Sequence, residues 1–275
     1  MLGAICGDII GSRFERYNIR RKDFDLFTDF SRFTDDTVMT CAVAAALLNH
    51  LHNHTDLSQD AVRYMQSYGR AFPHRGYGGN FSQWIKSPDP KPYNSFGNGA
   101  AMRVSPCGFL AKTLEEAQEY ARQVTKVSHN HPEGMRGAES IASAVFLAKT
   151  GASKQEISKY INEHYYTIDF TLDDIRYTYE FDVSCQGSVP QALEAFFESK
   201  NFEDAIRNAI SIGGDSDTIG AITGSVAEAY YGVPPELAEK VVNAYLNDFL
   251  QKLVTEYYRV VREPSSIIND SKPQI

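Results

Sequence analysis

Two short acidic motifs, far apart in the sequence, contain the residues best suited to chemistry. The first is Thr34-Asp35-Asp36-Thr37 and the second is Gly213-Gly214-Asp215-Ser216-Asp217-Thr218. Each places carboxylates beside threonine hydroxyls. If folding brings four carboxylates together, their repulsion and lost hydration must be compensated, and hard divalent cations do this. Oxygen ligands of this kind suit Mg²⁺ or Mn²⁺ and not Zn²⁺, so the motifs predict a metal centre.

Helix capping is the competing interpretation, because each motif directly precedes a segment with helical character and Asp is a common residue at helix starts. Capping does not require doubled acids, a threonine in both motifs or a Gly213-Gly214 pair, which permits unusual backbone angles and close approach to a ligand. Asp215 and Asp217 also cannot lie on one face of a continuous helix, so at least one must come from the turn. These features favour metal binding.

Glu15 is a third candidate acid. It follows a stretch rich in small residues, 3–14, which indicates a tightly packed first helix. An ordinary surface acid near Arg16 or Arg20 is the alternative interpretation. Proximity to a metal cluster would favour a functional role.

Two further segments could bind a ligand. Residues 94–103 run from a loop into a helix start and offer successive backbone amides, a geometry that receives phosphate, although an ordinary glycine turn has the same pattern. His129 lies between a helix and Pro132, where a histidine can also satisfy helix carbonyls. No matching cysteine or histidine set supports a zinc site there.

The elements that must position these residues are helices, because helical periodicity dominates and no long alternating stretch predicts a strand. The sequence therefore predicts an all-α fold. Capping-box patterns at Thr113 and Ser153 mark two helix starts, and small residues along 218–231 indicate a central buried helix. The expected helices are 34–53, 58–72, 113–128, 132–149, 153–164, 171–180, 189–199, 202–211, 218–231 and 236–261.

One connection, residues 73–99, is much longer than compact domains normally contain and is rich in Gly, Pro, Asn and Tyr, which predicts a binding loop. With 275 residues and 43% hydrophobic content the chain can bury one large core. We expect one domain over 1–262 and a C-terminal tail over 263–275 that is poorly ordered or docked only by its isoleucines.

Composition excludes several classes of function. A net charge of −8 without a basic stripe argues against nonspecific nucleic-acid binding. The four cysteines are scattered and are expected to be reduced packing thiols. The longest apolar run, 41–48, is far shorter than a bilayer span, and no leader peptide is recognisable. We therefore expect a cytoplasmic protein without a membrane partner.

Taken together, several motifs resemble the ADP-ribosylglycohydrolase family, which includes ADP-ribosyl hydrolases and dinitrogenase-reductase-activating glycohydrolases. The similarity covers 1 to about 232. The motifs are Gly7-Asp8 with Gly11 and Glu15, Thr34-Asp35-Asp36-Thr37, Tyr77-Gly78-Gly79, Gly97-Asn98-Gly99 with Met102-Arg103, His129, and Gly213-Gly214-Asp215-Ser216-Asp217-Thr218. The resemblance implies a compact orthogonal multi-helix bundle. It also implies a di-metal cleft with two Mg²⁺ or Mn²⁺ ions that cleaves the glycosidic bond at the anomeric carbon of the distal ribose of ADP-ribose.

The resemblance also implies roles for individual residues. Glu15 corresponds to a glutamate that contacts a metal and takes part in catalysis. Glu15 and Asp215 are the acids expected to participate, with Asp36 beside them, and which of them is the base stays open. The implied metal ligands are Thr34, Asp35, Asp36, Asp215, Asp217 and Thr218.

The implied substrate contacts lie on the loop and on His129. His129 corresponds to a residue that reaches the distal ribose, and Gly78 lines the same loop region. The resemblance also implies that members acting on arginine adducts need an acid in the loop before the pyrophosphate segment. The nearest loop position here is Asn80, which argues against an arginine-linked substrate. The implied pyrophosphate loop consists of Ser95, Phe96, Gly97, Asn98 and Gly99, with Phe96 stacking on adenine.

Two other functions stay open from the sequence. A two-metal phosphoesterase acting on the pyrophosphate would use the same ions. A noncatalytic ADP-ribose-binding or structural relative is the second alternative, although every implied ligand is present. The identity of the leaving group and the oligomeric state are not predicted.

Overall fold

The computed structural model describes residues 1–263 and is all-α over that part of the chain, as the sequence predicts. A short 3-10 turn, η1 (Asn98–Ala100), precedes α5, and the β-pairing of the described residues is an isolated bridge between Gly97 and Ser184. None of the described helices is both long and apolar enough to cross a bilayer. The helices are α1 (Leu2–Gly11), α2 (Asp35–Asn53), α3 (Leu57–Ala71), α4 (Gly79–Lys86), α5 (Ser105–Leu110), α6 (Leu114–Thr125), α7 (Pro132–Lys149), α8 (Lys154–His164), α9 (Leu172–Ile175), α10 (Cys185–Phe197), α11 (Phe202–Ser211), α12 (Ser216–Tyr231), α13 (Pro235–Tyr245) and α14 (Asp248–Arg262).

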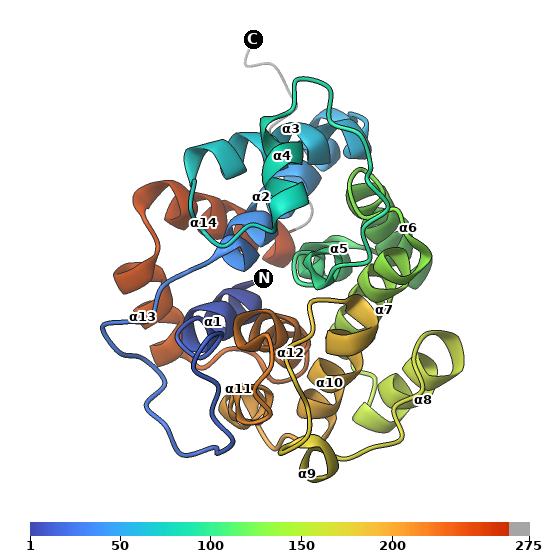
Figure 1. Cartoon of the computed structure of the whole chain (residues 1–275). Helices are drawn as coiled ribbons and strands as arrows, with labels where there is room; N and C mark the ends of the chain where they lie inside the picture. Colours follow the sequence, from blue (N-terminus) through green and yellow to red (C-terminus); the bar gives the residue numbers. More distant parts are fainter. Residues whose placement is uncertain (264–275) are drawn as a thin grey trace.

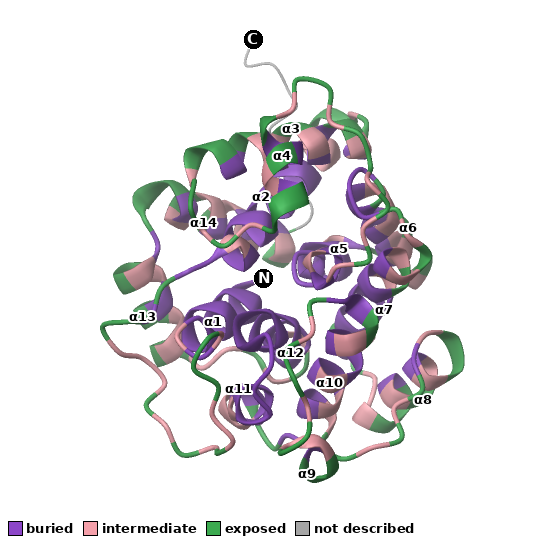
Figure 2. Cartoon of the chain, in the orientation of Figure 1, coloured by how far each residue is buried: buried purple, intermediate pink, exposed green. Residues whose placement is uncertain are grey.

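An antiparallel pair, α1 and α12, occupies the middle of the molecule (Figure 1). Every residue of α1 is buried, and α12 is buried from its start to Glu228 (Figure 2). A Cβ atom at Gly7 would lie 1.9 Å from the carbonyl oxygen of Gly220, and one at Gly3 would lie 2.1 Å from that of Gly224. The predicted tight first helix and central buried helix are therefore confirmed.

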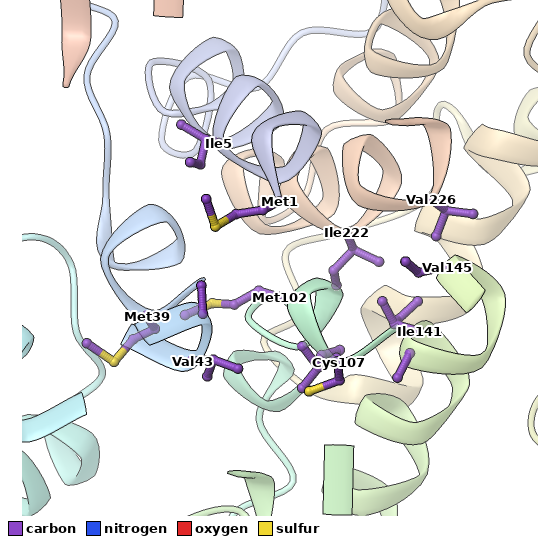
Figure 3. Close-up of a cluster of buried hydrophobic side chains, with 14 of the residues drawn as sticks. Met1, Ile5, Met39, Val43, Met102, Cys107, Ile141, Val145, Ile222 and Val226 are labelled. Atoms are coloured by element: carbon purple, nitrogen blue, oxygen red, sulfur yellow. The ribbon is translucent and has the colours of Figure 1, made fainter. Parts of the chain in front are cut away.

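The hydrophobic core joins this pair to the surrounding helices. Its side chains come from both ends of the sequence and meet between α1, α2, α5, α7 and α12 (Figure 3). All four cysteines are free and buried, which agrees with packing thiols. The labelled core residues are Met1, Ile5, Met39, Val43, Met102, Cys107, Ile141, Val145, Ile222 and Val226.

The largest differences between the predicted and the observed helix boundaries are in three places. The helix expected over 236–261 is two helices, because the Asn247 side chain accepts a hydrogen bond from the Leu250 amide at 3.1 Å and starts α14 afresh. The helix expected over 171–180 is the single turn of α9. The helix expected over 189–199 begins earlier, at Cys185, because Ser184 caps it and Pro190 is accommodated inside it.

The connection over 73–99 is not free of secondary structure, because it contains α4. Phe81, Trp84 and Ile85 on this helix are buried, and the Trp84 indole donates to the Val127 carbonyl at 3.0 Å. These contacts hold the rest of the connection against the core. The expectations for the tail beyond Glu263 lie outside the described residues, and the division into one domain over 1–262 stays a prediction.

Candidate metal centre

The two acidic motifs meet in the folded chain. The Thr218 hydroxyl donates to Asp36 Oδ2 at 3.3 Å across 182 positions of sequence. Carboxylate oxygens of Asp8, Asp36 and Asp217 lie within 4.8 Å of one another, and all three residues are buried. No arginine or lysine among residues 1–263 forms an ion pair with the acids of either motif. The convergence that the sequence suggested is therefore present, without protein cations to neutralise it.

Asp8, on α1, holds the first motif in place. Its carboxylate accepts hydrogen bonds from the Thr34 amide at 2.9 Å, the Thr34 hydroxyl at 2.7 Å, the Thr37 amide at 3.1 Å and the Thr37 hydroxyl. These four donors occupy much of its accepting capacity. Although Asp8 belongs to the buried triad, we assign it the role of an anchor. The sequence reasoning named Asp8 only within the Gly7-Asp8 motif of the resemblance and did not count it as a site residue.

In the first motif a threonine caps the helix, and the carboxylates are not needed for capping. Thr34 is the N-cap of α2 and accepts a hydrogen bond from the Asp36 amide at 3.3 Å, so the threonine satisfies the helix start. Asp36 Oδ1 is buried without a hydrogen-bond partner in the described chain. Asp35 is half-buried and faces a cavity. An orphaned carboxylate oxygen is costly in a buried site, and a bound cation would satisfy it.

The second motif has the unusual backbone that its glycines suggested. Gly213 and Gly214 have φ of 68° and 75°, and a Cβ atom at Gly214 would lie 2.3 Å from the Tyr179 ring. Asp215 occupies the N-cap position of α12 but makes no capping bond with its side chain. Its Oδ2 accepts instead from the Asn98 amide group at 2.7 Å. Capping therefore does not explain why Asp215 is an acid.

Burial gives these carboxylates raised pKa values. Desolvation by burial, with the charges of Asp8 and Asp35 second, raises the pKa of Asp36 well above its usual range. Burial and then the charge of Asp215 do the same for the pKa of Asp217. Burial and then the charge of Asp8 raise the pKa of Asp35 to about 8. The cluster thus holds protons when no cation is bound, and its set of hard oxygen donors fits Mg²⁺ or Mn²⁺.

A cavity of about 320 Å³ opens beside Asp35. Five of the seven residues predicted to bind substrate line this cavity. The amides of Gly97 and Asn98 already donate within the protein, to Ser95 Oγ at 3.2 Å and to the Val183 carbonyl at 2.7 Å. These two amides are therefore not free for a phosphate. The five lining residues are Gly78, Ser95, Gly97, Gly99 and His129.

The other two predicted substrate residues lie outside the wall of this cavity. Phe96 is 47% exposed and its ring centroid lies 5.2 Å from that of His131. Asn98 is buried and its side chain also donates to Ser188 Oγ at 3.1 Å. Phe96 can reach an exposed ligand group, whereas Asn98 positions Asp215.

Glu15 directly follows the turn after α1 and is half-buried. It lines a second cavity of about 400 Å³. Burial is the main cause of the raised pKa values of Asp215 and Asp217, and the charge of Glu15 adds to both. Glu15 thus approaches the acid cluster from the end of α1.

Arg103 is a second residue that sequence reasoning missed as an individual site residue. It is fully buried and lines the cavity beside Asp35. The sequence signal was an arginine inside an apolar stretch, 100–111, with no acid nearby to pair with it. Only the folded structure reveals which groups it contacts.

Comparisons with known proteins point to one family. A family model described as ADP-ribosylglycohydrolase matches residues 1–266. Human ADP-ribosylhydrolase ARH3 is 28% identical, over 85% of this chain and 84% of that protein. The ADP-ribosylarginine hydrolase Tri1 of Pseudomonas putida is 30% identical, over 64% of this chain and 48% of that protein. A solved structure titled ADP-ribosylglycohydrolase-related protein complex superposes with a TM-score of 0.70 at 23% identity, covering 94% of this chain and 97% of that one, which supports the fold.

Proposed function

Since the chain belongs to the ADP-ribosylglycohydrolase family, we propose that it is an ADP-ribosylhydrolase that needs two Mg²⁺ or Mn²⁺ ions. It cleaves the bond at the anomeric carbon of the distal ribose of an ADP-ribosyl adduct and releases ADP-ribose. One observation carries this proposal: buried acids from two distant motifs converge beside a ligand-sized cavity, and no cationic side chain of residues 1–263 pairs with them.

The ions would be held by the oxygen donors of the two motifs, and the orphaned Asp36 Oδ1 supports that fit. When bound, such ions polarise substrate oxygens and lower the pKa of water. The anchoring of the first motif by Asp8 preorganises its donors. The donor set is Thr34, Asp35, Asp36, Asp215, Asp217 and Thr218.

Two acidic side chains of the protein would transfer protons during the reaction. Glycoside cleavage through an oxocarbenium-like transition state needs an acid for the leaving group and a base for water. Glu15 and Asp215 are the proposed pair, with Asp36 completing the set. Asn98 donates to Asp215 Oδ2 and so fixes the orientation of that carboxylate. His129, Ser95, Gly97 and Gly99 would surround ADP-ribose in the cavity, with the exposed Phe96 against the adenine, while Asn98 supports Asp215.

The chemical identity of the leaving group is a separate part of this proposal. Relatives carry names for a general ADP-ribosylhydrolase and for an ADP-ribosylarginine hydrolase. Asn80 lines the cavity and is the loop position nearest to the acid that the family resemblance implies for members acting on arginine adducts. We therefore propose a substrate other than an arginine adduct, because Asn80 supplies no negative charge for a guanidinium.

Product analysis tests the proposal. The full chain is incubated with ADP-ribosylated serine peptide, ADP-ribosylated arginine peptide, O-acetyl-ADP-ribose and an ADP-ribosylated nucleic-acid end, each with Mg²⁺ and each with a chelator. Free ADP-ribose that needs Mg²⁺ is the expected product. Formation of AMP would instead identify a phosphoesterase, and binding of ADP-ribose without turnover of any adduct would identify a noncatalytic relative.

A further inference from the structure

Arg103 is a fully buried guanidinium beside the proposed ligand cavity. Within residues 1–263 it forms no ion pair, and its Nε has no hydrogen-bond partner. Its Nη2 donates to Ser128 Oγ at 2.9 Å and lies 3.4 Å from His129 Nδ1. A buried charge is costly to keep, so we expect the Arg103 guanidinium to have a role beyond packing.

These contacts determine the direction of hydrogen bonding around His129. A guanidinium can only donate, so Ser128 Oγ accepts from Arg103 and keeps its own proton to donate. Ser128 Oγ lies 2.9 Å from His129 Nδ1. Arg103 Nη2 can only present a proton to Nδ1, and the Ser128 hydroxyl still has a proton that it can donate there. In a neutral imidazole, an accepting Nδ1 leaves the ring proton on Nε2.

The environment also keeps the ring neutral. Burial, and then the charge of Arg103, lower the pKa of His129 well below its usual value. The rings of Phe81 and Tyr93 lie with centroids 6.0 Å and 5.7 Å from that of His129. Besides Arg103 and Tyr93, the ionisable group on the wall of this cavity is Asp35, and no carboxylate hydrogen-bonds to the imidazole within the described chain.

The opposite nitrogen faces the glycine loop. A Cβ atom added at Gly99 would lie 3.3 Å from His129 Nε2, and one added at Gly97 would lie 3.6 Å away. The two glycines thus leave space beside Nε2 that any side chain would reduce. Because Gly97, Gly99 and His129 all line the same cavity, a proton on Nε2 is available to a ligand there.

We propose that Arg103 is a positioning residue: with Ser128 it holds His129 in the tautomer protonated on Nε2, so that the imidazole donates a hydrogen bond to an oxygen of the ligand. The identification of this oxygen as part of ADP-ribose rests on the proposed function. The tautomer itself does not depend on it.

Nuclear magnetic resonance of the full chain tests the tautomer without any turnover. In protein labelled with ¹⁵N-histidine, two-bond ¹H–¹⁵N correlations identify the protonated ring nitrogen, and His129→Gln assigns the signals by their loss. We expect a protonated Nε2 and a bare Nδ1 between pH 6 and pH 8.5. A proton on Nδ1, or an equal mixture of tautomers, would overturn the proposal.

Variants distinguish the contribution of Arg103 to the tautomer from that of Ser128. Arg103→Met should allow both tautomers of His129, because a serine hydroxyl alone can donate or accept. It should also weaken ADP-ribose binding about tenfold, the effect of one lost hydrogen bond. Arg103→Lys should restore part of the preference for the Nε2 tautomer and part of the ADP-ribose affinity. Ser128→Ala should keep the tautomer, since Arg103 still donates. The matched control is Arg63→Met, which removes an exposed arginine.

The outcomes remain distinct if Arg103→Met does not fold, because the wild-type spectrum and the Arg103→Lys and Ser128→Ala variants still decide the tautomer. Unchanged ADP-ribose affinity in a folded Arg103→Met whose tautomer has been released would overturn the donor role. If ADP-ribose binds and the tautomer is as expected but no adduct is hydrolysed, the proposed function fails while this inference stands. If hydrolysis occurs with the proton on Nδ1, the inference fails alone.

Discussion

At the scale of single residues, the buried aspartates differ in how many hydrogen bonds their carboxylates already accept. Asp8 accepts four, and it holds the turn that carries Thr34 and Thr37. Within the described residues, Asp36 accepts one from the Thr218 hydroxyl through Oδ2 and none through Oδ1, since the single proton of the Thr34 hydroxyl goes to Asp8. The carboxylate with free accepting capacity is the better candidate for a cation ligand.

The first prediction concerns Asp36. Asp36→Asn keeps the size of the side chain but removes a charge from the metal site, so Mg²⁺-dependent release of ADP-ribose should fall at least about 100-fold. Far-ultraviolet circular dichroism should stay unchanged. Asp173→Asn, at a side chain that is 88% exposed, is the matched control and should keep full activity. Undiminished turnover in Asp36→Asn would remove this residue from the mechanism.

A second prediction separates proton transfer from binding at Glu15. Glu15→Gln removes a proposed acid but leaves the donors of the two acidic motifs and the cavity beside Asp35 unchanged, so kcat should fall by about 10² to 10⁴. The affinity for ADP-ribose, measured by calorimetry, should change only a few-fold. Glu163→Gln, at an exposed surface glutamate, serves as the control. A change confined to KM would assign Glu15 to binding instead.

At the scale of elements, the contact between α1 and α12 aligns the site. The same antiparallel packing that brings Gly7 against Gly220 brings Gly11 within reach of α12, where a Cβ atom would lie 2.4 Å from the Ser216 carbonyl oxygen. The end of α1, which leads to Glu15, is thereby held beside the start of α12, which carries Asp217. The small residues therefore determine the distance between parts of the proposed site.

The third prediction tests this contact. Gly7→Ala places a methyl group where the Gly220 backbone lies, so the helices must separate, and the free energy of unfolding should fall by about 3 kcal/mol or more. Gly79→Ala is the matched control, because an added Cβ there meets nothing within 4 Å, and its stability should stay within about 0.5 kcal/mol. Chemical denaturation measures both. Equal stability of the two variants would show that α1 and α12 can repack.

At the scale of the whole molecule, the acid cluster links the stability of the fold to pH and to metal. Burial raises the pKa of Asp8 to about 6, and burial with the charge of Asp8 raises that of Asp35 to about 8. In the unfolded chain both carboxyls titrate near about 4. The folded chain therefore binds more protons than the unfolded chain over this range, and its stability falls as the pH rises.

The fourth prediction follows from this loss of stability with rising pH. With a chelator present, the thermal midpoint should fall between pH 4 and pH 8, since the raised pKa of Asp8 alone corresponds to about 3 kcal/mol over this range. Saturating Mg²⁺ should reduce this fall, because bound cations replace the protons. The double variant Asp36→Asn with Asp217→Asn should flatten the pH dependence measured with the chelator. A midpoint that rises with pH in the chelated wild type would contradict the buried acid cluster.

Much of the local structure could be predicted because its causes are local. Hydrogen bonds between residues three apart start α6 at Thr113 and α8 at Ser153, where the sequence placed them. The break at Asn247 is local too, but the continuous apolar periodicity on both sides of it hid the start of α14. The short helix α4 was missed because its stability comes from burying Phe81 and Trp84 against other elements.

By itself, the sequence determined the all-α class, the tight packing of the first helix and the two acidic motifs, because these depend on side-chain size, periodicity and residue type. Only the tertiary structure decided that Asp8 anchors the first motif, that Asn98 turns towards Asp215 and that Arg103 reaches His129. The physical reason is that each of these contacts joins groups at least 26 positions apart, so no local pattern encodes it.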